Sequence, residues 1–100
     1  MQSPSPTQSR SQRIEDVLTL TFAPTLLRVA DESARHAGHG GARPEGETHY
    51  AVLLVSEAFR GQSRVARSRA VHDALAGEFD TGLHALSLTL RTPEDHAAAG

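Results

Sequence analysis

The sequence has no cysteine among its 100 residues. This absence excludes a disulfide scaffold, a thiol nucleophile, and an iron–sulfur or cysteine-type zinc site held by this chain alone. Lysine is absent too, because all ten basic residues are arginine, which excludes a Schiff-base lysine and a P-loop lysine. Imidazole and carboxylate groups are therefore the metal donors that this chain offers.

Long apolar runs are also missing. The longest uninterrupted run is Tyr50–Val55, which is far shorter than the roughly 20 residues that a membrane-spanning helix needs. The N-terminal residues contain no apolar segment of signal-peptide length. We therefore expect a chain that stays in the cytoplasm and has no membrane partner.

Size and charge narrow the class of protein further. A chain of 100 residues predicts one domain. Apolar residues make up 38%, but fifteen of them are alanine, so the larger apolar side chains suffice for one small two-layer domain. Ten basic residues stand against twelve acidic ones, for a net charge of −2. This balance excludes an overall polybasic nucleic-acid binder, although it leaves room for a local basic patch.

The two ends of the chain differ in composition from its middle. Residues 1–12 are mostly Ser, Pro, Gln and Thr, and such a segment buries too little apolar surface to offset its ordering entropy. We therefore expect a disordered tail over residues 1–12 and a folded domain over residues 13–94. Residues 95–100 are rich in alanine and end in glycine, so we expect them to fray.

Periodicity predicts the first half of the domain. Apolar residues at helical spacing predict a helix over Gln12–Phe22, with Ser11 as its N-cap and Pro24 as its stop. Thr25–Ala30 is a short strand candidate. Asp31–Gly46 holds four glycines and a proline, and it predicts a long exposed loop, of the kind that is often functional or disordered.

The second half reads as strand, helix, strand. Glu47–Ser56 is apolar on both faces, which predicts a central strand covered on at least part of both sides. Arg64–Asp80 carries an apolar stripe at helical spacing, and Leu83–Leu90 alternates as a strand does. A short helix opening with Pro93 can follow. The order αββαβ predicts an α+β fold, with helices packed on one face of a three-stranded mixed sheet.

Several short motifs follow one another in a recognisable order. They are Asp31-Glu32-Ser33 with His36, Glu47-Thr48-His49-Tyr50, Phe59-Arg60-Gly61, Val71-His72-Asp73-Ala74-Leu75 and Leu83-His84-Ala85-Leu86. Over about Arg13–Pro93 the sequence resembles the BolA family, and its loop histidine matches the bacterial members of the histidine-loop subclass. The resemblance implies an αββαβ fold related to the type II KH domain. Gly61-Gln62-Ser63-Arg64 departs from the Gly-x-x-Gly clamp of KH domains, which argues against KH-style RNA binding.

The resemblance also implies a function. BolA-like proteins are non-enzymatic adaptors that form a heterodimer with a monothiol glutaredoxin. The two proteins share a [2Fe–2S] cluster ligated by glutathione, for cluster trafficking or iron sensing, and no cluster is expected in the isolated chain. The alternative that the resemblance implies is a DNA-binding transcriptional regulator of morphology and stress genes, as some bacterial members are.

Histidines are the candidate metal ligands. The resemblance implies that His84 and the loop residue His36 ligate the cluster, with His39 as the substitute for His36. The residues alone leave other readings open. His84 shares its strand face with leucines and reads as a hydrogen-bonded residue at the strand end, and the loop histidines read as solvated side chains. His36, His39 and His49 also have the spacing of a three-histidine zinc site, but no motif places a carboxylate base beside them.

Four arginines cluster at the start of the second predicted helix. They are Arg60, Arg64, Arg67 and Arg69, with no acidic residue between Glu57 and Asp73. Guanidinium groups suit phosphate or a partner's carboxylates, so this patch and His72 predict contacts with DNA, glutaredoxin or glutathione. A solvated helix start is the alternative. No nucleophile and base are placed by any motif, which argues against an enzyme.

Overall fold

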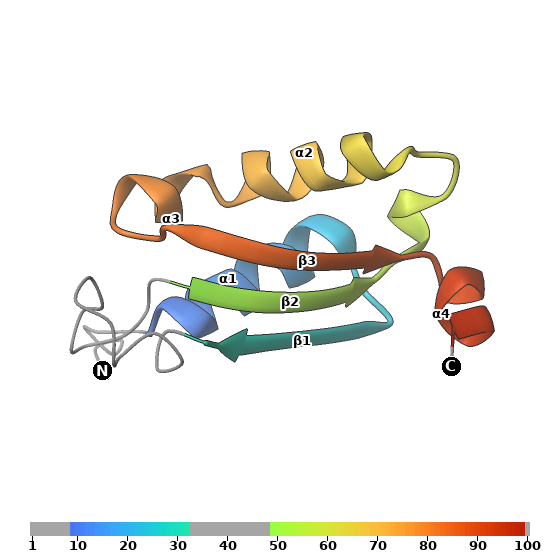
Figure 1. Ribbon diagram of the computed structural model, residues 1–100, viewed down its shortest axis with the longest axis horizontal. Helices are drawn as coiled ribbons and strands as arrows, with labels where there is room; N and C mark the ends of the chain where they lie inside the picture. Colours follow the sequence, from blue (N-terminus) through green and yellow to red (C-terminus); the bar gives the residue numbers. More distant parts are fainter. Residues whose placement is uncertain (1–8, 33–48, 100) are drawn as a thin grey trace, which may run out of the picture.

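The computed structural model describes residues 9–32 and 49–99. Its elements are α1 (Arg10–Phe22), β1 (Leu26–Asp31), β2 (His49–Val55), the 3₁₀ helix η2 (Glu57–Phe59), α2 (Arg64–Ala74), α3 (Ala76–Asp80), β3 (Ala85–Arg91) and α4 (Pro93–Ala99). The sheet has the order β1-β2-β3, with β1 antiparallel and β3 parallel to β2 (Figure 1). The predicted α+β class and mixed sheet are confirmed. In these residues no helix combines the length and apolarity needed to cross a membrane.

Helix α1 begins earlier than the sequence predicts. The Ser9 side chain caps it by accepting a hydrogen bond of 3.1 Å from the Gln12 backbone N–H, and such a cap satisfies a donor that the first turn leaves free. The prediction of Ser11 as N-cap was therefore wrong. The predicted tail was wrong for its last three residues, since Arg10 already lies in the helix and is 8% exposed. Residues 1–8 lie outside the described part of the chain.

A long-range ion-pair cluster explains the early start. Arg10 donates hydrogen bonds to the Glu78 carboxylate at 2.6 Å and to the Thr81 hydroxyl at 2.9 Å. Arg13 donates to the same carboxylate at 2.9 and 3.0 Å. These contacts fasten the first turn of α1 to α3, more than 60 residues later in the chain. Local composition gives no sign of such a partner.

The core lies on one face of the sheet. It contains Ile14, Leu18 and Phe22 from α1, Tyr50, Val52 and Leu54 from β2, Phe59, Val71, Leu75 and Leu83. Because α1 and α2 both pack into this cluster, the predicted arrangement of helices on one face is confirmed. On the other face of β2, Ala51 and Leu53 are half-buried and Val55 is 1% exposed. The prediction of a central strand with partial cover on both faces therefore holds.

The predicted helix Arg64–Asp80 is two helices in the structure. Leu75 leaves the helical conformation, with φ −101° and ψ 15°, while its side chain stays 1% exposed in the core. Gly77 follows, and glycine favours a continuous helix less than any residue except proline. The break lets α3 turn at the end of α2 (Figure 1), and this turn carries Glu78 to the two arginines of α1.

The C-terminal segment is more regular than the sequence predicts. Fraying was predicted for residues 95–100, yet α4 extends to Ala99; only Gly100 falls outside the description. The Asp95 N–H donates to the Thr92 hydroxyl at 3.1 Å, and the Thr92 N–H donates to the Asp95 carboxylate at 3.2 Å. This reciprocal capping box, with Pro93 in the first turn, fixes the start of the helix.

Candidate functional site

Three segments meet at one end of the sheet. β1 ends there, while β2 and β3 begin there (Figure 1). The Glu32 N–H donates to the His49 carbonyl at 2.8 Å, and His49 is in register with Ala85 at the start of β3. Both boundaries of residues 33–48 therefore lie at this end of the sheet, with His49 beside the start of β3 and Glu32 one strand further away. Those residues are outside the described part, and they include the predicted ligands His36 and His39.

His84 lies at this end, between α3 and β3. The preceding residues position it, because Leu83 is 2% exposed and Gly82 has a φ of 129° that only glycine adopts without strain. The strand begins at Ala85, so the prediction that His84 shares a strand face with the leucines was wrong. Its side chain is exposed instead. An exposed imidazole is accessible to a ligand or partner without any change in the fold.

His84 and His49 form a pair of imidazoles. Their ring centroids are 6.1 Å apart, and the rings meet edge to face at 87°. Sequence reasoning did not predict this pair, although it follows from the parallel register of β2 and β3 once that register is known. Within residues 9–32 and 49–99, no three His, Asp or Glu side chains come close enough to hold a metal ion. The predicted zinc site of His36, His39 and His49 depends on residues outside that part and stays a prediction.

The predicted arginine patch divides in the structure. Arg60 donates hydrogen bonds to the Glu57 carboxylate at 2.6 and 2.9 Å, and it forms a second ion pair with Glu94. These carboxylates, Glu94 first, raise the pKa of Arg60 above its ordinary value. The charge of Arg60 is therefore offset within the chain, in part by a residue that is 34 positions later.

Arg67 has a structural role. Its guanidinium donates to the Leu90 carbonyl at 3.2 Å, to the Asp95 carboxylate at 3.1 Å and to the Gln62 carbonyl at 3.0 Å. It also lies 5.8 Å from the centroid of the buried Phe59 ring, a favourable position for a cation. Arg67 therefore ties the start of α2 to β3 and α4, and its side chain is only 15% exposed.

Three of the predicted binding residues remain at the surface. Arg64 and Arg69 are exposed. Neither side chain makes a hydrogen bond or an ion pair with residues 9–32 or 49–99. His72 is exposed as well, and its ring stacks on Phe79 at 5.3 Å with an angle of 16°. The predicted patch is thus reduced to two free guanidinium groups and one histidine that packs at the corner between α2 and α3.

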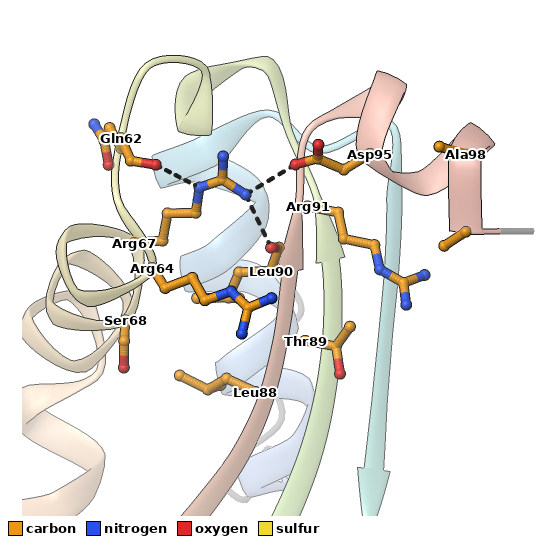
Figure 2. Close-up of a pocket in the computed structure, with 11 residues that line it drawn as sticks. Gln62, Arg64, Arg67, Ser68, Leu88, Thr89, Leu90, Arg91, Asp95 and Ala98 are labelled. Carbon is orange, nitrogen blue, oxygen red and sulfur yellow. Dashed lines mark hydrogen bonds and ion pairs between the residues drawn. The ribbon is translucent and has the colours of Figure 1, made fainter.

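An open groove lies at the opposite end of β3 from His84. It measures about 860 Å³ and is lined by Gln62, Arg64, Arg67 and Ser68 beside α2, by Leu88, Thr89, Leu90 and Arg91 of β3, and by Asp95, Ala98 and Ala99 of α4 (Figure 2). Sequence reasoning found its arginines on α2, but it could not find the groove, because β3 and α4 join it only through the tertiary fold. The Thr92 N–H and then the Arg67 guanidinium lower the pKa of the Asp95 carboxyl.

The sequence is similar to a protein-family model and to known proteins. A family model described as BolA-like protein matches residues 18–95. SufE-like protein 1 of Arabidopsis thaliana is 44% identical over 91 residues, which cover 87% of this chain and 24% of that protein. The chain thus spans about a quarter of that relative's length. The DNA-binding transcriptional regulator BolA of Escherichia coli is 42% identical over 77 residues, which are 77% of this chain and 70% of that protein.

A solved structure agrees with the sequence comparison. The BolA domain of SufE1 from Arabidopsis thaliana superposes with a TM-score of 0.78 at 43% identity, over 88% of this chain and 96% of that domain. Relatives occur in both a plant and a bacterium, so the bacterial histidine-loop subclass stays a prediction. The agreement of the family model, the relatives and the fold shows that this chain belongs to the BolA-like family.

Proposed function

We propose that this chain is a non-enzymatic adaptor that docks on a monothiol glutaredoxin and shares its glutathione-ligated [2Fe–2S] cluster. The shared cluster would serve in cluster trafficking or in iron sensing. We expect the protein to act in the cytoplasm. One observation carries the proposal. The exposed imidazole of His84 lies at the end of the sheet where the segment with His36 and His39 begins and ends.

The donor chemistry of the chain supports this role. With no cysteine, the chain can supply nitrogen donors while glutaredoxin and glutathione supply the thiolates. Imidazole in place of thiolate on one iron changes the reduction potential of a [2Fe–2S] cluster, as in Rieske centres. His84 follows the buried Leu83 and precedes β3, so its backbone is held by the core while its ring remains accessible. A ligand on a rigid element is well positioned for exchange.

The second nitrogen donor of the proposal is His36, with His39 as its substitute. The chain enters that segment from Glu32 and leaves it at His49, and both residues lie at the end of the sheet where β3 begins. Both loop histidines thus belong to a segment whose two attachment points lie at the same end of the sheet as His84. Loss of His36 is expected to weaken cluster sharing less than loss of His84 does, because His39 can replace it.

The test is a titration of the protein with a monothiol glutaredoxin loaded with its cluster. We expect visible absorption and circular dichroism to change as the mixed complex forms. His84→Ala is expected to fold, because the side chain is exposed, and to bind the cluster-free glutaredoxin through the wider surface. It is expected to lose the altered spectrum, because alanine has no donor atom.

A matched control separates ligation from general effects of histidine loss. His96 lies in α4, at the far end of β3 from His84, and its Nδ1 accepts a 3.1 Å hydrogen bond from the Arg91 guanidinium. His96→Ala should leave the cluster spectrum unchanged. An unchanged spectrum in His84→Ala with an unchanged melting temperature would reject His84 as a ligand, and a lower melting temperature with an unchanged spectrum would make it a structural residue.

DNA binding is the second candidate function. It is favoured by the exposure of Arg64 and Arg69 and by the 42% identity to a relative named as a DNA-binding transcriptional regulator. If both guanidiniums contact phosphates, the variant with both changed to alanine should flatten the salt dependence of duplex affinity by about two units. Arg28→Ala, a change of an exposed arginine on β1, is the control and should lower the slope far less.

A further inference from the structure

The outer edge of β3 has backbone groups that no strand covers. β3 is the last strand in the sheet order. The Arg91 carbonyl accepts from the Ser56 N–H at 2.9 Å on the side of β2, whereas the Leu90 carbonyl accepts from Arg67 on the outer side. Backbone groups alternate along a strand, so the N–H and C=O of Leu88 also point outward. The outer edge at Leu88 therefore opens into the groove.

The charge of the groove is positive. Figure 2 shows the Arg64 side chain extending over the groove toward Leu88 and Leu90, and it makes no hydrogen bond or ion pair with residues 9–32 or 49–99. The carboxylate of Asp95 is already engaged by the Thr92 N–H and the Arg67 guanidinium. Arg64 is thus an exposed cation that no acidic side chain of the described residues pairs with.

We propose that this groove binds an extended acidic peptide segment of a partner protein as a fourth strand on the outer edge of β3. The peptide backbone would pair with the outward groups of Leu88 and with the Leu90 N–H, and a carboxylate of the peptide would bind Arg64. Strand addition of this kind takes its affinity from main-chain hydrogen bonds and its specificity from side-chain pockets. Peptides also present N–H donors at the strand repeat, which nucleic acid backbones lack.

Size and position agree with this occupant. A groove of about 860 Å³ falls within the range of about 300–1,000 Å³ that is common for ligand sites. The Arg67 guanidinium already donates to the Leu90 carbonyl at 3.2 Å, so this carbonyl marks one end of the open edge. The site lies at the end of β3 that is opposite to His84, so it goes beyond the proposed cluster site.

The test measures fluorescence anisotropy of a labelled octapeptide of alternating threonine and glutamate. We expect saturable binding that localises, by amide chemical shifts, to residues 88–90 and the start of α2. Arg64→Glu should weaken binding by about tenfold or more, because a close charge pair becomes a repulsion. Arg28→Glu, an equal charge change on β1, should alter the affinity by less than about twofold, since Arg28 lies two strands away from β3 and does not line the groove.

A second probe tests the backbone pairing itself. The same octapeptide is N-methylated either on its threonines or on its glutamates, and both forms keep their charge. Only the form methylated on the residues that face β3 loses edge hydrogen bonds, so one of the two peptides should bind about tenfold more weakly than the other. Equal binding of both peptides would overturn strand addition. Binding of an eight-nucleotide single-stranded DNA in preference to the peptide, self-association of the protein through this edge, or no binding of the peptide at millimolar concentration would each overturn the proposal.

Discussion

At the residue scale, a cluster of partly buried charged groups connects α1 to α3. Glu78 receives hydrogen bonds from both Arg10 and Arg13, and its side chain is 13% exposed. The guanidinium of Arg13, followed by Arg10, holds the pKa of the Glu78 carboxyl below its ordinary value. When one partner of such a cluster is removed, the others remain desolvated without compensation, which is why breaking it is costly.

Glu78→Gln tests this cluster. It keeps the shape of the side chain but removes the charge, so we expect the free energy of unfolding at pH 7 to fall by about 1–3 kcal/mol. The folded pKa of Glu78 is depressed, so the stabilisation is complete above the unfolded pKa of about 4.3 and is lost as the pH falls through the lower folded value. Urea unfolding of both proteins from pH 7 to pH 3 measures this difference.

The control for this series is Asp73→Asn, on the exposed side of α2. Its free energy of unfolding should stay within about 0.5 kcal/mol of wild type at pH 7. A gap between wild type and Glu78→Gln that stayed constant down to pH 3 would contradict the role of the Glu78 charge, because a protonated carboxyl and an amide differ little.

At the element scale, the two faces of β3 differ, because one packs against the core and the other is open. Leu86, Leu88 and Leu90 pack against the core cluster, whereas Ala85, Ser87 and Thr89 are exposed. Leu86→Ala should lower the free energy of unfolding by about 2–3 kcal/mol, toward the low end for a core leucine because the side chain is only partly buried. Ser87→Ala, one residue later, should change it by less than about 0.5 kcal/mol. Thermal and urea denaturation measure both, and equal effects would mean that the faces are reversed.

Helix α1 supplies a second prediction at this scale. A chain that begins at Gln12 lacks the Ser9 cap and the Arg10 anchor, whereas a chain that begins at Gln8 keeps both. The loss of a cap alone costs about 1 kcal/mol, and the buried arginine contacts add to it. We therefore expect the shorter chain to melt at a clearly lower temperature than the longer one. Equal melting temperatures would restore the sequence-based assignment of residues 1–12 as a dispensable tail.

Local periodicity accounts for what the sequence could predict. The alternation in β3 and the helical stripe of α1 depend on neighbours within four residues, so they were readable from the sequence. Arg60 and Arg67 also pair with carboxylates of α4 that lie 34 and 28 residues away, and no local pattern encodes these two pairs. The break at Leu75 escaped prediction because its side chain keeps the apolar stripe of a continuous helix.

At the scale of the whole molecule, β3 separates two candidate sites. His84 precedes its first residue, and the groove with Arg64 lies beside its last residues. A strand of seven residues is about 23 Å long at about 3.3 Å per residue. One small domain could thus hold a cluster at one end and a partner's peptide at the other, with the sheet as a rigid spacer.

This separation predicts that the two proposed functions are independent. Substitutions at residues that are further apart than about 7–10 Å and share no partners change the free energy additively. His84→Ala should therefore abolish the mixed-cluster spectrum and leave the affinity for the acidic octapeptide unchanged, while Arg64→Glu should do the reverse. The doubly substituted protein should show both losses and no more than their sum, measured by visible absorption and by fluorescence anisotropy on the same sample. A peptide affinity that changed when the glutaredoxin-bound cluster was present would show instead that the two ends of β3 are coupled, and that partner binding regulates cluster sharing.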